Sequence, residues 1–370
     1  MIIKNKIFNL FANCKLVEGY TRAVICDLQR NNIYPIPTSL FVILKLHGTT
    51  TFNELVETYG QENETTLEEY FEFLLNHELI FFHDNPELFP VMNDFWDEPF
   101  EITNCIIDFN NISFEKVINI KKAIDATPIK ALQIRVFEEI KANELDLILA
   151  NVKPNGLNSI ELILKYSNSI SLDQLRNICT KYPYIFTITV FNSPEEITSY
   201  NSEGGAFGQI YCLKDFVFSE KSCGNILPDF FTINTKTYTE SLHHNSCLNR
   251  KISIDTQGSI KNCPSMGESF GNIDTNTFKE ALSKPDFKKH WFINKDKIHV
   301  CKDCEFRYVC TDCRAYIENP KDILSKPLKC GYNPYSGEWT DWFLESQKSK
   351  TIEFYKLTIP IRTSLYEQSN

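Results

Sequence analysis

The chain has 370 residues, with 38 lysines and arginines against 48 aspartates and glutamates, and its formal net charge is -10. This length allows two or three folded units, at roughly 100 to 200 residues for each. The acidic balance argues against nucleic acid or an anionic membrane as a partner, because both need a basic surface. The sequence starts without the apolar core and cleavage site of an export signal, and 18 apolar residues never run together, so a soluble cytoplasmic protein is expected.

Residues 1–95 predict a small winged-helix-like unit. Two β runs, at 8–17 and 22–29, are joined by the turn residues Glu18 and Gly19 and predict an opening hairpin. Helical stretches are expected at residues 38–46, 51–60 and 65–77, followed by a return strand at 79–82. Thr65 and Glu68 have the spacing of a capping box at the start of the last helix.

Residues 100–235 alternate between strand and helix patterns, which makes the expected fold class α/β. The predicted strands are 104–109, 131–137, 159–166, 185–191 and 208–218, and the helices include 114–126 and 171–182. Such alternation predicts a parallel sheet or an open barrel with right-handed crossovers. A cysteine-rich third unit follows over residues 240–345, and its end, residues 338–349, predicts a helix.

Seven of the thirteen cysteines lie within residues 247–330. Clustered cysteines in a reducing cytosol indicate metal ligands rather than disulfides. The other six, by default small buried apolar residues, are Cys14, Cys26, Cys105, Cys179, Cys212 and Cys223.

The seven clustered thiols suit either zinc or an iron–sulfur cluster. Cys247 and Cys263 lie at the two ends of a predicted hairpin, which holds them close together. One tetrahedral site would use four cysteines and leave three, whereas two sites would use all seven and lack one ligand.

The order CysX10GlyX4Cys, CysX2CysX5CysX2Cys and a final Cys resembles the SPASM domain of radical SAM peptide-modifying enzymes. The usual pattern has three residues between the fifth and sixth cysteines, whereas here only Thr311 and Asp312 separate Cys310 from Cys313. The resemblance implies two [4Fe-4S] clusters. The first would be held by Cys301, Cys304, Cys310 and Cys330, and the second by Cys247, Cys263, Cys313 and an upstream ligand. We expect His244 to be that ligand, since histidine can replace cysteine on cluster iron; zinc is the alternative occupant.

The radical SAM motif CxxxCxxC does not occur in the sequence, and the first predicted strand of the middle unit holds only Cys105. The middle unit therefore resembles a degenerate radical SAM barrel without its catalytic cluster, and no bound SAM is expected. The catalytic residues are unknown, because no P-loop, GxSxG or HExxH occurs.

Three further segments, HNSCLNRK, FRYVCTDCRAY and CGYNPYSGEW, resemble the SPASM-containing peptide maturase of the grasp-with-spasm systems. The resemblance implies an ATP-grasp ligase and a ribosomally made precursor peptide as partners, and a winged-helix unit that binds the precursor leader as an added strand. Two functions stay open. The clusters would serve electron transfer or substrate anchoring during peptide maturation, or they would be structural sites of a non-catalytic adaptor that presents the precursor to the ligase.

Overall fold

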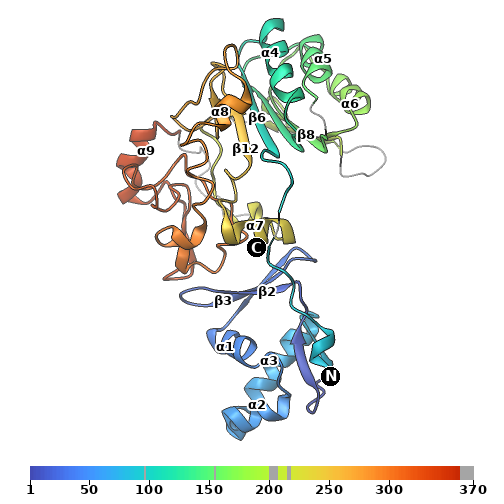
Figure 1. The fold of residues 1–370 in the computed structure, drawn as a ribbon, viewed down its shortest axis with the longest axis vertical. Helices are drawn as coiled ribbons and strands as arrows, with labels where there is room; N and C mark the ends of the chain where they lie inside the picture. The colour runs from blue at the N-terminus through green and yellow to red at the C-terminus, as the bar shows by residue number, and fades with distance from the viewer. Residues whose placement is uncertain (96, 154–155, 200–206, 215–217, 359–370) are drawn as a thin grey trace.

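The computed structural model describes residues 1–95, 97–153, 156–199, 207–214 and 218–358. The N-terminal unit has two small antiparallel sheets and three helices (Figure 1). β1 (Ile7–Leu10) pairs with β5 (Ile80–His83), and the other sheet joins β2 (Cys14–Glu18), β3 (Ala23–Asp27) and β4 (Asn32–Ile36). The helices are α1 (Thr38–Leu46), α2 (Phe52–Tyr59) and α3 (Glu64–Asn76).

This unit confirms the three predicted helices and corrects two details. Residues 8–17 are not one strand, because β1 pairs with β5 and only β2 forms the hairpin with β3. The capping box lies at Thr51 and Glu54, at the start of α2, whereas Thr65 lies inside α3. Tertiary packing decides both, since the Phe71 ring contacts those of Phe8 and Phe52 at centroid distances of 4.8 and 5.1 Å.

The middle of the chain forms an eight-stranded, mostly parallel sheet in the order β10-β11-β9-β8-β7-β6-β12-β13. Its parallel strands are β6 (Asn104–Phe109), β7 (Ala131–Val136), β8 (Ser159–Lys165), β9 (Ile185–Ser193), β11 (Gln209–Lys214) and β12 (Lys251–Ile254). β10 (Ile197–Ser199) and β13 (Ile260–Lys261) are antiparallel edge strands. The α/β class and the five predicted strands are confirmed. Of the fifth predicted strand, 208–218, residues 215–217 lie outside the described part.

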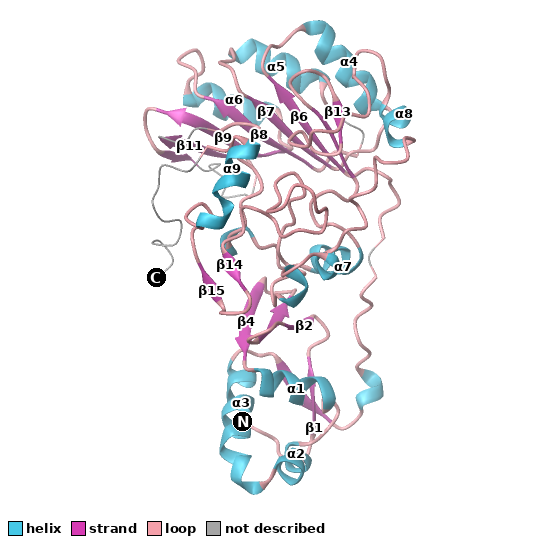
Figure 2. Ribbon diagram, turned by 90° about the vertical axis from the view of Figure 1, so that its left-hand side faces the viewer, coloured by secondary structure: helices cyan, strands magenta, loops and turns pink. Residues whose placement is uncertain are grey.

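Three helices cover one face of this sheet: α4 (Phe114–Asp125), α5 (Ala142–Asn151) and α6 (Leu172–Lys181) (Figure 2). Their apolar faces and alternate strand residues form the largest buried core of the described chain. Side-chain caps from Ser113 and Ser171 fix the starts of α4 and α6. The other face of the sheet is left for the loop-rich C-terminal segment.

That segment has little regular structure and lies between the large sheet and the N-terminal unit (Figures 1 and 2). Its elements are α7 (Thr235–His243), α8 (Phe278–Leu282), the short strands β14 (Tyr332–Asn333) and β15 (Glu338–Trp339), and α9 (Ser349–Tyr355). The prediction of a helix at 338–349 is wrong, because Trp339 pairs with Tyr332 in a two-stranded ladder and α9 begins only at Ser349. The unit boundaries at 95, 100, 235 and 240 stay a prediction, although β12 joins the large sheet beside β6.

No helix in the described part of the chain is both long and apolar enough to cross a membrane.

Candidate metal centres

Four cysteines line one cavity in the C-terminal segment: Cys301, Cys304, Cys310 and Cys330. Cys301 begins a short 3-10 turn, and Val300 before it has a φ of 68°, a strained value for a β-branched residue. Apolar and aromatic side chains complete the lining, among them Ile226, Phe231, Tyr332 and Trp339. These are the four thiols predicted for the first site, and the structure brings them to one cavity.

Two lysines face this first group. Lys295 is only 3% exposed, and its Nζ lies 3.5 Å from Cys310 Sγ. Burial lowers the pKa of Lys295, but the neighbouring Cys310 and Cys301 raise it above the ordinary lysine value. Lys326 is buried as well, and Cys330 raises its pKa against the effect of burial. The first group therefore sits beside two buried ammonium groups that would balance negative charge on bound thiolates.

Burial disfavours the thiolate form of three cysteines in the first group. Burial raises the pKa of Cys301 to about 11 and that of Cys310 to about 12, and burial followed by Glu305 raises that of Cys304. A metal would have to displace these protons, so its binding would depend on pH.

A second group of four cysteines forms where the loop before α7 meets the β12–β13 hairpin: Cys223, Cys247, Cys263 and Cys313. Cys263 is the neighbour that affects the pKa of Cys223 most, and Cys313 interacts electrostatically with Cys223 and Cys247. Gly224 has a φ of 88°, and a Cβ there would lie 2.7 Å from Cys313 Sγ, so only glycine allows this approach.

The second group also has cations beside it, of which Lys251 is half-buried and Lys329 is buried. Lys251 Nζ lies 3.2 Å from Cys247 Sγ, and Lys329 Nζ donates to the carbonyl of Cys223 at 2.9 Å. The hydrogen bond with Cys263, and after it Arg135, lower the pKa of the Cys223 thiol well below its ordinary value, whereas burial raises that of Cys313 to about 12.

Cys223 is the residue that sequence reasoning missed. It was predicted to be a buried apolar cysteine, and the upstream ligand was assigned to His244. His244 ends α7, where its ring packs 5.5 Å from Phe292, and burial followed by Arg250 lowers its pKa. None of its described contacts is a cysteine, so the structure gives His244 no support as the fourth ligand. The only sequence signal was the position of Cys223 upstream of Cys247, beside Gly224.

Across the described residues, no three histidine, cysteine, aspartate or glutamate side chains converge closely enough to hold a single metal ion. The cysteines of the first group line a cavity instead.

The carboxyl ends of β6 and β7 hold a buried ion pair. Asp108 and Arg135 are opposite each other in the parallel ladder, and each is 1% exposed. Arg135 Nε and Nη2 donate hydrogen bonds of 2.6 Å to the two carboxylate oxygens of Asp108. Cys105, the single cysteine of β6, is 1% exposed in the core, where burial raises its pKa.

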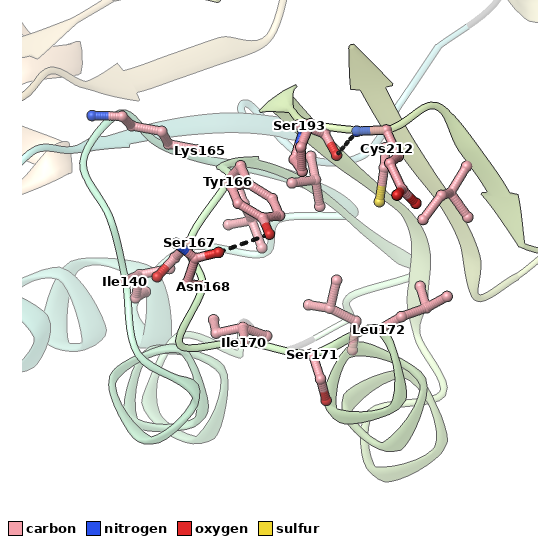
Figure 3. A pocket seen from close by; sticks show the side chains of 16 residues that line it. Ile140, Lys165, Tyr166, Ser167, Asn168, Ile170, Ser171, Leu172, Ser193 and Cys212 are labelled. Carbon is pink, nitrogen blue, oxygen red and sulfur yellow. Dashed lines mark hydrogen bonds between the residues drawn. The ribbon is translucent and has the colours of Figure 1, made fainter.

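A separate cavity of about 330 Å³ opens beside the carboxyl ends of β8 and β9 (Figure 3). Its floor is apolar, with Leu172 and Cys212, and its rim is polar, where Tyr166 donates to Asn168 at 2.9 Å. None of the eight clustered cysteines lines it.

Comparison with known proteins identifies the cysteine-rich segment. Residues 246–305 match the SPASM family, an iron–sulfur cluster-binding domain. The SPASM assignment made from the cysteine spacing is thereby confirmed. The matched residues include Cys247, Cys263, Cys301 and Cys304 and end before the last three cysteines.

No curated protein matches the chain. Among solved structures, SuiB from Streptococcus suis bound to S-adenosylmethionine is 10% identical, with 86% of this chain and 98% of SuiB covered and a TM-score of 0.32. SuiB bound to its precursor peptide SuiA is 8% identical, with 83% and 96% covered and a TM-score of 0.30.

Proposed function

We propose that this chain is an iron–sulfur protein that holds two [4Fe-4S] clusters and acts in the maturation of a ribosomally made peptide. The observation that carries the proposal is the gathering of eight cysteines into two groups of four, each with a lysine ammonium group beside one of its thiols. Four thiolates are the usual ligand set of such a cluster. The SPASM match supports iron over zinc as the occupant.

The first cluster would be held by Cys301, Cys304, Cys310 and Cys330, and the second by Cys223, Cys247, Cys263 and Cys313. When bound, clusters of this class accept and donate single electrons or hold a substrate at an exposed iron. The chain's own residues supply the surroundings. Lys295 and Lys251 each place an ammonium group beside a thiol and would stabilise the thiolate form, as hydrogen bonds to cluster sulfurs do.

The peptide would bind to the N-terminal unit. β4 pairs only with β3 among the described strands, which leaves its outer edge for an added peptide strand. Pro35 lacks a backbone N–H, so pairing would be strongest over residues 32–34. Tyr34 packs against Phe73 of α3 and against His77, which follows that helix, and these rings form a shelf beside that edge. A groove of about 340 Å³ is lined by residues of α1 and α3, among them Val42 and Tyr70.

The partners would be a precursor peptide and an ATP-grasp ligase, as the family resemblance implies, and a reducing cytoplasm would keep the thiols available for metal. Deleting residues 1–95 should abolish binding to these partners. Unchanged binding of both by the shortened chain would refute the assignment.

We further infer that SAM is not a cofactor, because the sequence has no CxxxCxxC to leave an iron open to it. Incubation of reduced protein with SAM should give no 5′-deoxyadenosine above a no-enzyme control, and detection of that product would refute this point.

An adaptor function is the second candidate, favoured by the complete set of four thiols at each site, which leaves no position open for substrate. The two functions differ in redox behaviour. An electron-transfer role predicts that dithionite reduces at least one cluster and gives a paramagnetic signal, whereas clusters that resist reduction would favour the adaptor.

A further inference from the structure

The N-terminal unit touches the first cysteine group directly. The turn between β2 and β3 lies on the loop that carries Cys301 and Cys304: the Tyr20 backbone N–H donates to the carbonyl of Asp303 at 2.9 Å. Arg307 donates to the carbonyl of Glu18 from the other side. The approach is so close that a Cβ on Gly19 would lie 2.8 Å from Glu305 Cβ.

The sheet behind this turn shares a hydrophobic core with the same site. Val17, Val24 and Cys26 of β2 and β3 are at most 1% exposed and belong to one buried cluster with Cys310 and Cys330. One face of the N-terminal sheet therefore covers the first group, while α1, α2 and α3 pack on a different core.

An ion pair links the two units beside the thiols. Glu305, next to Cys304 in the chain, is 0% exposed, and its Oε1 accepts hydrogen bonds from Arg22 Nε at 2.7 Å and from the Tyr332 hydroxyl. Its Oε2 has no hydrogen-bond partner. Arg22 is thus the cation that compensates a buried carboxylate beside a predicted ligand, and it comes from the N-terminal unit.

We propose that the turn at residues 18–22 is the outer wall of the first metal site and that Arg22 is the positioning residue that keeps this wall closed. A cluster at that site is then protected from solvent by the unit that would bind the peptide, whereas the second site has no such cover from that unit. The inference rests on the proposed function, because it needs a cluster at the first site.

The test uses full chains with one cluster each. A Cys263→Ala chain keeps iron only at the first site, and a Cys304→Ala chain only at the second. Two wall variants, Gly19→Ala and Arg22→Met, are introduced into both one-cluster chains. Gly19→Ala pushes the turn away from Glu305 without changing the charge. Arg30→Met is the matched control, since Arg30 also pairs with a 0% exposed carboxylate of the same unit, Asp27, at 3.1 Å, but its other ion-pair partner is Glu78 of the N-terminal unit and not a residue of the cysteine-rich segment. Anaerobic iron release to bathophenanthroline disulfonate is followed by absorbance.

Both wall variants should release first-site iron faster, by roughly tenfold, the factor that a change of about 1.4 kcal/mol in local opening gives. Second-site release should not change, and Arg30→Met should change neither. Hydrogen exchange over α1, α2 and α3 checks that the unit itself stays folded, and Gly19→Ala carries the test if Arg22→Met does not fold. Unchanged first-site release in a folded wall variant overturns the inference alone, whereas an iron-free parent chain overturns the proposed function with it.

Discussion

Replacing Cys223 by alanine should remove the second cluster and leave the first intact. The two cysteine groups share no member, so the loss should be one cluster of two, a fall from about eight to about four irons per chain. The remaining spectrum should be the one that a Cys263→Ala chain also retains. Cys105→Ala is the control, because Cys105 is also a free cysteine but lies fully buried in the core of β6, away from both groups, and the iron content of this variant should stay at the wild-type value.

His244→Ala separates this account from the assignment made from sequence. With Cys223 as the fourth ligand, this variant should keep both clusters and both spectra. The assay is anaerobic purification of each variant, iron and sulfide analysis, and electron paramagnetic resonance of the reduced protein. Full iron in Cys223→Ala, together with loss of half the iron in His244→Ala, would refute our assignment of the second site.

Two further predictions concern the stability of the scaffold. Arg135→Met leaves Asp108 as an uncompensated buried charge and should lower the free energy of unfolding by about 3 to 5 kcal/mol. The double variant Arg135→Met/Asp108→Leu should recover most of that loss. Urea unfolding measures both variants, and an equal loss of stability in the two would contradict this prediction. Burial lowers the pKa of His290 from its ordinary 6.5 to about 4, so the unfolded chain binds a proton that the folded chain does not. The free energy of unfolding should therefore fall by up to about 3 kcal/mol as the pH drops from about 6.5 to 4. It should fall less steeply in His290→Gln, and parallel plots of unfolding free energy against pH for the two proteins would count against this prediction.

The parallel strands could be predicted because each is a short apolar run bounded by polar residues, and the structure has β6 at the residues expected for it. The pairing of β12 with β6 could not, since it joins segments about 150 residues apart, and no local pattern encodes such a contact. The helix expected at 338–349 failed for a similar reason, because Trp339 is held in a ladder with Tyr332.

The first cysteine group was predictable because its spacing is a motif. Cys223 was not, because a single cysteine outside any motif has the same local signature as a core residue such as Cys105. Only the fold brings the thiol of Cys223 to Cys263. The same holds for Lys295, because its ammonium group meets Cys310, fifteen residues later in the chain, only through tertiary packing.

The central claim is that the two cysteine groups hold iron–sulfur clusters, and metal analysis of the anaerobically isolated full chain tests it most directly. We predict a brown protein with about eight irons and about eight sulfides per chain, as two [4Fe-4S] clusters require. Stoichiometric zinc without iron or sulfide would contradict the account.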